Sequence, residues 1–171
     1  MKKVKVKFLN YKGIDFGKII KEEFFSSAIR VRNRWQDNLT RGVGATGNRG
    51  KAWKDTGQAI SDVTVEPQSP TEFSYEVGGD VIQLAVAEFG RSAGARIPPY
   101  QPISEWARRK GLTPRDGDTW EQMVNKIRYG ISRHGIQGFA PGRLSAMVER
   151  RKLPDRIEKR IQQEVEKITV D

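Results

Sequence analysis

The longest periodic stretch of the chain is residues 15–41, DFGKIIKEEFFSSAIRVRNRWQDNLTR. Apolar side chains recur in it every three or four positions, the spacing of one face of a helix: Phe16, Ile20, Phe24, Ala28, Val31, Trp35 and Leu39. Asp15 is suited to cap the start of this helix, and Gly42 is suited to end it. The stretch therefore predicts a helix of roughly 40 Å, long enough to pack across a sheet.

Strand patterns lie on both sides of this helix. Residues 3–9 alternate lysine with Val4, Val6 and Phe8, which predicts a half-buried strand with a lysine face. Residues 59–66 and 71–77 also read as strands, and residues 81–88 are apolar on both faces, as in a central strand. We therefore expect an antiparallel sheet of three strands, with the N-terminal strand as a fourth.

The second half of the chain reads as helical. We expect helices over 103–110 and over 119–134, the latter capped by Asp118 with Glu121 three residues on and ended by Gly135. A last helix over 154–169 starts at Pro154, a favoured first-turn residue. The glycine-rich stretch 42–52 and the stretch 89–102 read as flexible loops. All 171 residues fit one α+β domain.

The composition narrows the classes of function. The net charge is +10, with no cysteine and a single histidine, His134, which excludes thiolate zinc sites, cysteine nucleophiles and multi-histidine metal sites. The positive charge suggests a polyanion or an acidic partner surface, or simply a solvated face. No apolar stretch approaches the roughly 20 residues of a membrane span, and the N-terminus does not read as a signal peptide, so we expect a soluble protein.

No set of residues forms a convincing active site. His134 ends an expected helix, where a cation is favoured on local grounds. Gly42, Gly44 and Gly47 form GxGxxG, but a helix precedes them where a dinucleotide site needs a strand. We therefore expect no enzyme, no metal and no cofactor.

Three segments of the chain, in order, match short sequence signatures of one known family. Residues 55–62, DTGQAISD, resemble the signature "TG.L..SI". Residues 87–90, AEFG, precede a proline-containing loop and ISEWARRKG at 103–111, similar to "EFG" and "WAR.KG". Residues 127–139, IRYGISRHGIQGF, resemble "I...I...GI.P.PF", although Gln137 and Gly138 stand where the family often has a second proline.

Together these segments resemble the neck and tail-completion (head–tail joining) proteins of tailed phages. The resemblance implies a structural protein of the virion, made in the host cytoplasm, with a curved antiparallel sheet packed on helices. Related proteins form rings, commonly hexamers, around the DNA channel. The implied partners are other copies of the chain, neighbouring neck proteins, the tail-tube protein and the genomic DNA that passes through the channel, bound without sequence preference.

Within that hypothesis, two groups of residues are candidates for contacts. The candidates for contact with DNA or a partner are Arg49, Lys51, Arg91 and Arg96. The candidates for a subunit or partner interface are Trp53, Ile97, Tyr100, Arg150 and Arg151. Two alternatives remain open: a stand-alone basic nucleic-acid-binding module, and a small hydrolase or nuclease that uses His134.

Overall fold

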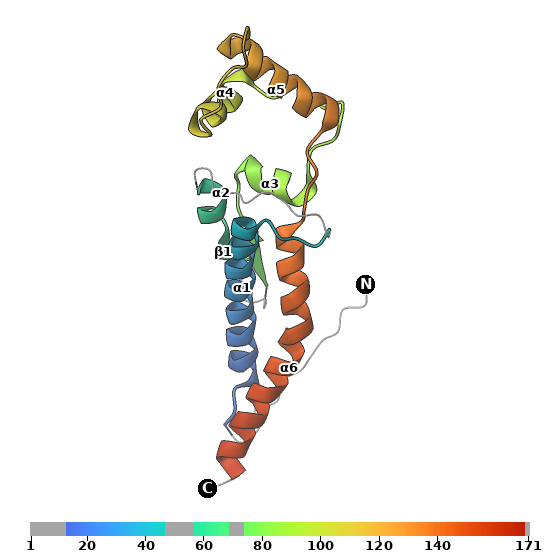
Figure 1. Ribbon diagram of the computed structural model, residues 1–171. Helices are drawn as coiled ribbons and strands as arrows, with labels where there is room; N and C mark the ends of the chain where they lie inside the picture. The colour runs from blue at the N-terminus through green and yellow to red at the C-terminus, as the bar shows by residue number, and fades with distance from the viewer. Residues whose placement is uncertain (1–12, 47–56, 69–73, 170–171) are drawn as a thin grey trace.

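The computed structural model describes residues 13–46, 57–68 and 74–169. In these ranges the chain forms six helices and two short strands (Figure 1). The elements are α1 (Phe16–Arg41), α2 (Gln58–Ser61), β1 (Thr64–Pro67), β2 (Tyr75–Gly78), α3 (Ile82–Phe89), α4 (Tyr100–Arg109), α5 (Trp120–His134) and α6 (Pro141–Thr169).

The molecule is elongated and has two parts. The helices α1 and α6 lie side by side and antiparallel, with α2, α3 and the two strands gathered beside them (Figure 1). We call these elements the body. The helices α4 and α5 pack on each other beyond α3, at the end of the body where α6 begins (Figure 1). We call residues 91–137, which contain α4 and α5, the end lobe.

The long first helix is confirmed. The side chain of Asp15 accepts a hydrogen bond from the backbone N–H of Lys18 and so caps the start of α1. Gly42 ends the helix in the left-handed conformation that glycine adopts without strain, at φ 65°.

The expected antiparallel sheet of about four strands is wrong. The described chain is 65% helical, so the fold is α+β only in a loose sense. Its sheet holds β1 and β2 alone, paired antiparallel with Val65 opposite Val77 and Glu66 opposite Glu76. The strand expected over 3–9 lies outside the described residues.

Two of the expected strands contain helix. Residues 81–88 fall mostly in α3, where Leu84 and Ala87 are buried three positions apart, the spacing of a helix face. A short apolar run fits a buried strand or a buried helix equally well, and length and periodicity cannot separate them. The expected strand over 59–66 begins only at Thr64, because the preceding residues close the single turn of α2.

The start of α5 lies one residue after the expected start. Thr119, not Asp118, caps α5: its hydroxyl accepts from the N–H of Gln122 at 3.2 Å, and the Gln122 side chain accepts from the N–H of Thr119 at 2.8 Å. Asp118 instead pairs with Lys126 at 2.7 Å.

The last helix is much longer than expected. It begins at Pro141, and Pro154 lies inside it. The first half carries the buried polar residues Ser145 and Glu149 on its inward side, so apolar periodicity does not reveal it.

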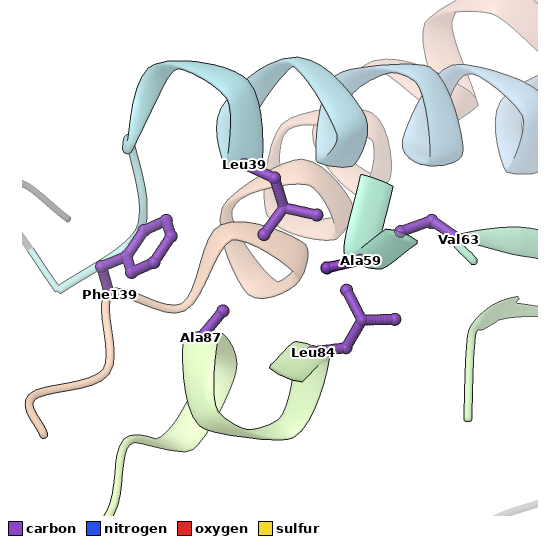
Figure 2. Packing of buried hydrophobic residues seen from close by; sticks show 6 residues of the cluster. All are labelled: Leu39, Ala59, Val63, Leu84, Ala87 and Phe139. Carbon is purple, nitrogen blue, oxygen red and sulfur yellow. The ribbon is translucent and has the colours of Figure 1, made fainter. Parts of the chain in front are cut away.

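The core lies where α1, α2 and α3 meet the start of α6. Its buried side chains converge on one another (Figure 2): Leu39, Ala59, Val63, Leu84, Ala87 and Phe139. A second, polar contact joins the long helices, because the Asn38 side chain donates to the Pro141 carbonyl at 3.1 Å and to the Ser145 hydroxyl at 3.0 Å. Buried polar groups with satisfied hydrogen bonds fix the register of α1 against α6.

Candidate functional site

The end of α3 is tied to the start of α6. The carboxylate of Glu88 accepts from the backbone N–H of Gly142 at 2.8 Å and of Arg143 at 3.0 Å. The first N–H groups of a helix lack partners within the helix and favour a negative charge. The Ala87 carbonyl adds bonds from the N–H of Phe139 at 2.9 Å and of Ala140 at 3.2 Å. Glu88 therefore acts as a cap supplied from another element.

The two chain segments that lead to the end lobe touch as they leave this junction. A Cβ added at Gly138 would lie 2.5 Å from the backbone nitrogen of Gly90, closer than real Cβ atoms approach. Just beyond, Arg91 and Ile136 form an antiparallel bridge with N···O distances of 2.7 and 2.8 Å. Only glycine permits this close backbone approach.

The three segments that resemble the phage family meet at this place. Each of them supplies one buried residue to the core: Ala59 from the first, Ala87 from the second and Phe139 from the third (Figure 2). Gly57, also in the first, starts α2 with φ 74°. One residue of each segment therefore packs in the core, while residues 103–111 and most of 127–138 lie in the end lobe, in α4 and α5.

One face of α3 is apolar and exposed. Ile82 is 71% exposed and Phe89 is 77% exposed, and the exposed Ala85 lies between them. Residues spaced by three and four positions share a helix face. This exposed apolar face of α3 is a candidate surface for contact with another protein.

The end lobe is basic and stiffened by stacked cations. Residues 91–137 carry nine basic and four acidic side chains. The guanidinium of Arg108 lies 5.5 Å from the ring centre of Trp120, and that of Arg128 lies 5.7 Å from the ring centre of Tyr100. Arg128 also donates to the Pro98 carbonyl at 2.7 Å, which holds the incoming loop against α5.

Four of the residues expected to form contacts belong to the end lobe or to the loop that enters it. Arg91 is half-buried and donates to the carbonyl oxygen of Arg96, so its guanidinium is used inside the loop. The Arg96 side chain is exposed, and Ile97 is 36% exposed. Tyr100 lies half-buried against Arg128. Of these four, Arg96 and Ile97 remain on the surface for a partner.

The other expected contact residues are divided between α6 and residues outside the described ranges. Arg150 and Arg151 are exposed on α6, and Arg150 lines a groove along α1. Arg49, Lys51 and Trp53 lie outside the described residues. The body and the end lobe thus hold separate candidate surfaces.

Sequence reasoning missed a cluster of ion pairs between α1 and α6. Glu149, only 2% exposed, faces Arg30 and Arg34 at 3.4 Å and Arg156 at 2.7 Å. Glutamate and arginine two turns apart on α1 were the available signal, but charges on a helix usually face solvent.

Glu23 extends this cluster toward the end of α6. It pairs with Arg30 at 3.2 Å and with Arg160 at 3.1 Å. Hydrogen bonding to Glu23, together with Glu22, raises the pKa of Arg160. The long helices are therefore joined in this region by paired charges.

Among the described residues, no three acidic or histidine side chains gather to hold a metal ion. Within the same residues, no helix has both the length and the apolar character needed to cross a membrane. His134 is exposed at the end of α5.

In comparisons with known proteins, no family model matches the chain, and neither a curated protein nor a solved structure matches it.

Proposed function

We propose that the chain is a structural subunit of the neck of a tailed phage, which completes the tail and joins it to the head as part of a ring around the DNA channel. The observation that carries this proposal is the meeting of the three resembling segments in one core, through Ala59, Ala87 and Phe139. The shared contact of one residue from each segment supports reading the three segments as parts of one fold. The proposed protein is not an enzyme, and its place is the virion.

The exposed face of α3 supplies the ring contact. Ile82 and Phe89 would gain from burial against a different surface of the next subunit, and a head-to-tail contact of this kind closes into a ring. Fully burying one large apolar side chain stabilises an interface by about 1.5–3 kcal/mol. The resembled family commonly forms hexamers, so we propose six subunits.

The end lobe supplies the charge. Nine basic side chains against four acidic ones favour contact with DNA phosphates, and such contacts do not read sequence. The same charge would also suit an acidic surface on a neighbouring neck protein.

The mass of the purified chain in solution tests the proposal. Light scattering on a sizing column, alone and with assembled tail tubes of the same virus, is expected to give a ring-sized mass or binding to the tube ends. A stable 19.4 kDa monomer that ignores the tubes would contradict the proposal.

The stand-alone nucleic-acid-binding module is the second candidate, favoured by the charge of the end lobe. It predicts that the monomer binds duplex DNA with micromolar or tighter affinity and a steep salt dependence. The ring subunit predicts much weaker binding by the monomer. Measuring duplex binding by the monomer between about 50 and 200 mM salt separates the two.

A further inference from the structure

The charges of the chain are divided between segments of opposite sign. Residues 57–89, which hold α2, the two strands and α3, carry six acidic side chains and no basic one. The end lobe, residues 91–137, carries nine basic and four acidic side chains. Surfaces of opposite charge attract each other, whereas two copies of the same charged surface repel. A second copy of this chain therefore carries the charge that each of the two segments favours in a partner.

The acidic segment contains the exposed apolar face of α3. Ile82 and Phe89 lie at the two ends of this face, two turns and roughly 10 Å apart along the helix. Ala85 is exposed between them, and its small side chain leaves room for a flat ring between the two larger ones. Asp80 is exposed two residues before Ile82, so this end of the apolar face carries a negative charge.

The end lobe has a complementary face on α5. Tyr129 and Arg133 lie one turn apart on the same side of this helix, and both are exposed, Tyr129 at 58%. Lys126, near Tyr129 on the other side in sequence, is already paired with Asp118 at 2.7 Å. This face of α5 therefore presents a large aromatic ring with the guanidinium of Arg133 next to it.

The two faces do not cover each other within one chain. In the body α3 packs on α6, whereas α5 packs on α4 in the lobe, which projects beyond α3 (Figure 1). The exposed fractions of Phe89 and Tyr129 are 77% and 58%, so both faces are open in the single chain. Another molecule is needed to cover them.

The charges set the orientation in which the two helices can meet. Asp80 precedes the apolar face of α3, whereas Arg133 follows Tyr129 on α5. When the two charges are paired, Tyr129 reaches Ala85 only if α5 runs antiparallel to α3. Antiparallel helices also bring the negative end of one helix dipole beside the positive end of the other. Because the two faces differ, the contact repeats head to tail from copy to copy, as a closed ring requires.

We propose that Tyr129 of one subunit lies between Ile82 and Phe89 of the next subunit, with Arg133 paired to Asp80. This inference rests on the proposed function, and it names the second surface of the contact made by α3. Tyrosine and arginine are among the residues that contribute most to binding when an interface buries them.

Cross-linking between single-cysteine variants tests the contact, because the chain has no cysteine of its own. In rings assembled from a mixture of Ala85→Cys and Tyr129→Cys, a short bismaleimide is expected to link at least roughly ten times more dimer than in a mixture of Ala85→Cys and Glu105→Cys, since neighbouring thiols have a higher effective concentration. Glu105 is exposed on α4 and serves as the control. Equal yields in the two mixtures, or as much dimer from either variant of the first mixture alone, would overturn the proposal.

Exchanging the charges tests the contact without removing Tyr129. Arg133→Glu and Asp80→Arg each bring like charges together, so each is expected to raise the protein concentration at which rings dissociate by about tenfold. The double variant restores opposite charges and is expected to return to within about threefold of the unaltered chain. Arg115→Glu, exposed in the connection between α4 and α5, has the same change of charge and is expected to shift this concentration by less than about twofold.

Light scattering over a range of protein concentrations separates this proposal from the ring itself. An unaltered chain that stays monomeric throughout would contradict the ring, and the contact with it. Rings of the unaltered chain, combined with a double variant that dissociates as readily as the single variants, would overturn the contact alone. The face of α3 would then belong to a contact with a different protein.

Discussion

The carboxylate of Glu88 accepts a hydrogen bond from the backbone N–H of Gly142 at 2.8 Å, although the two residues lie on different helices and far apart in sequence. This contact closes the body where the chain returns from the end lobe. It gives α6 the N-terminal partner that its own preceding residues do not supply, since those residues are committed to Ala87 and to the bridge with Arg91.

Replacing Glu88 with alanine is expected to lower the free energy of unfolding by about 1–2 kcal/mol. Glu88→Gln keeps one acceptor and removes the charge, so its effect is expected to be about half as large. Urea unfolding measures both, with Glu105→Ala on the exposed side of α4 as the control. Equal free energies of unfolding for the Glu88 and Glu105 variants would show that the cap does not stabilise the fold.

Replacing Glu149 with glutamine is expected to destabilise the pairing of α1 with α6. The buried carboxylate faces three arginines, which would be left without their shared counter-charge. Removing one partner of a buried ion pair costs up to roughly 3–5 kcal/mol, and the partly exposed guanidinium groups reduce this to about 2–3 kcal/mol.

The matched control for Glu149 is Glu158→Gln, on the exposed side of the same helix. It is expected to change stability by less than about 0.5 kcal/mol. Thermal unfolding followed by circular dichroism compares the two, and similar melting temperatures would contradict the prediction.

Two glycines are expected to respond in opposite directions to alanine. A Cβ at Gly138 would lie within 3.0 Å of backbone atoms of Gly90, Phe89 and Glu88, so Gly138→Ala is expected to cost about 1–3 kcal/mol or more. A Cβ at Gly130, inside α5, meets nothing within 4 Å, so Gly130→Ala is expected to stabilise by about 0.5–1 kcal/mol. Chemical denaturation of both variants checks the contrast, which a shared sign would refute.

The exposed face of α3 is expected to control assembly. The double variant with Ile82→Asp and Phe89→Asp places two charges where the proposed ring contact needs apolar surface, so its mass by light scattering should fall to that of the monomer. Gln83→Asp changes an exposed residue of the same helix and should leave assembly intact. Rings that survive the double variant would move the subunit contact away from α3.

Arg96 is expected to contribute to the binding of DNA by the positively charged end lobe. If its guanidinium neutralises one phosphate, Arg96→Glu should make the slope of log affinity against log salt shallower by about 0.9. Lys159→Glu, exposed on α6 in the body, serves as the control with the same change of charge. A slope altered equally by both variants would indicate a general effect of net charge.

The sequence correctly predicted the helices that have a long apolar repeat or capping residues next to their ends. The helix from Phe16 to Arg41 shows an apolar stripe over many turns, and its caps at Asp15 and Gly42 are local hydrogen-bonding motifs. The boundaries of α5 came within about a residue for the same reason. Its cap was assigned to the wrong neighbour because Asp and Thr are both good capping residues.

The sheet and the start of α6 could not be predicted in this way. Residues 81–88 are too few to distinguish the repeat of two residues of a strand from the repeat of 3.6 residues of a helix. Their packing against Phe139 in the core favours the helix. The inward face of the first half of α6 carries the polar residues Ser145 and Glu149, so its sequence shows no apolar stripe. These two residues can be buried because α1 supplies Asn38 and the arginines that pair with them.

The candidate site was predictable only in part for a related reason. Residues such as Arg91 and Arg96 were chosen by charge and by their place in a loop, and charge alone does not tell an internal hydrogen bond from a free surface. The structure separates the two, because the Arg91 guanidinium binds the Arg96 carbonyl. The exposed apolar face of α3 could not be predicted from the sequence, because residues 81–88 were expected to form a strand.

The contact between Gly90 and Gly138 has a consequence for how such a protein can change over generations. The lobe enters and leaves the body through a single point, so residues 91–137 form an insertion whose two ends already touch. A short turn could join these ends and leave the core residues Ala87 and Phe139 where they are. Joining these ends would therefore remove the lobe as a unit without displacing the core of the body.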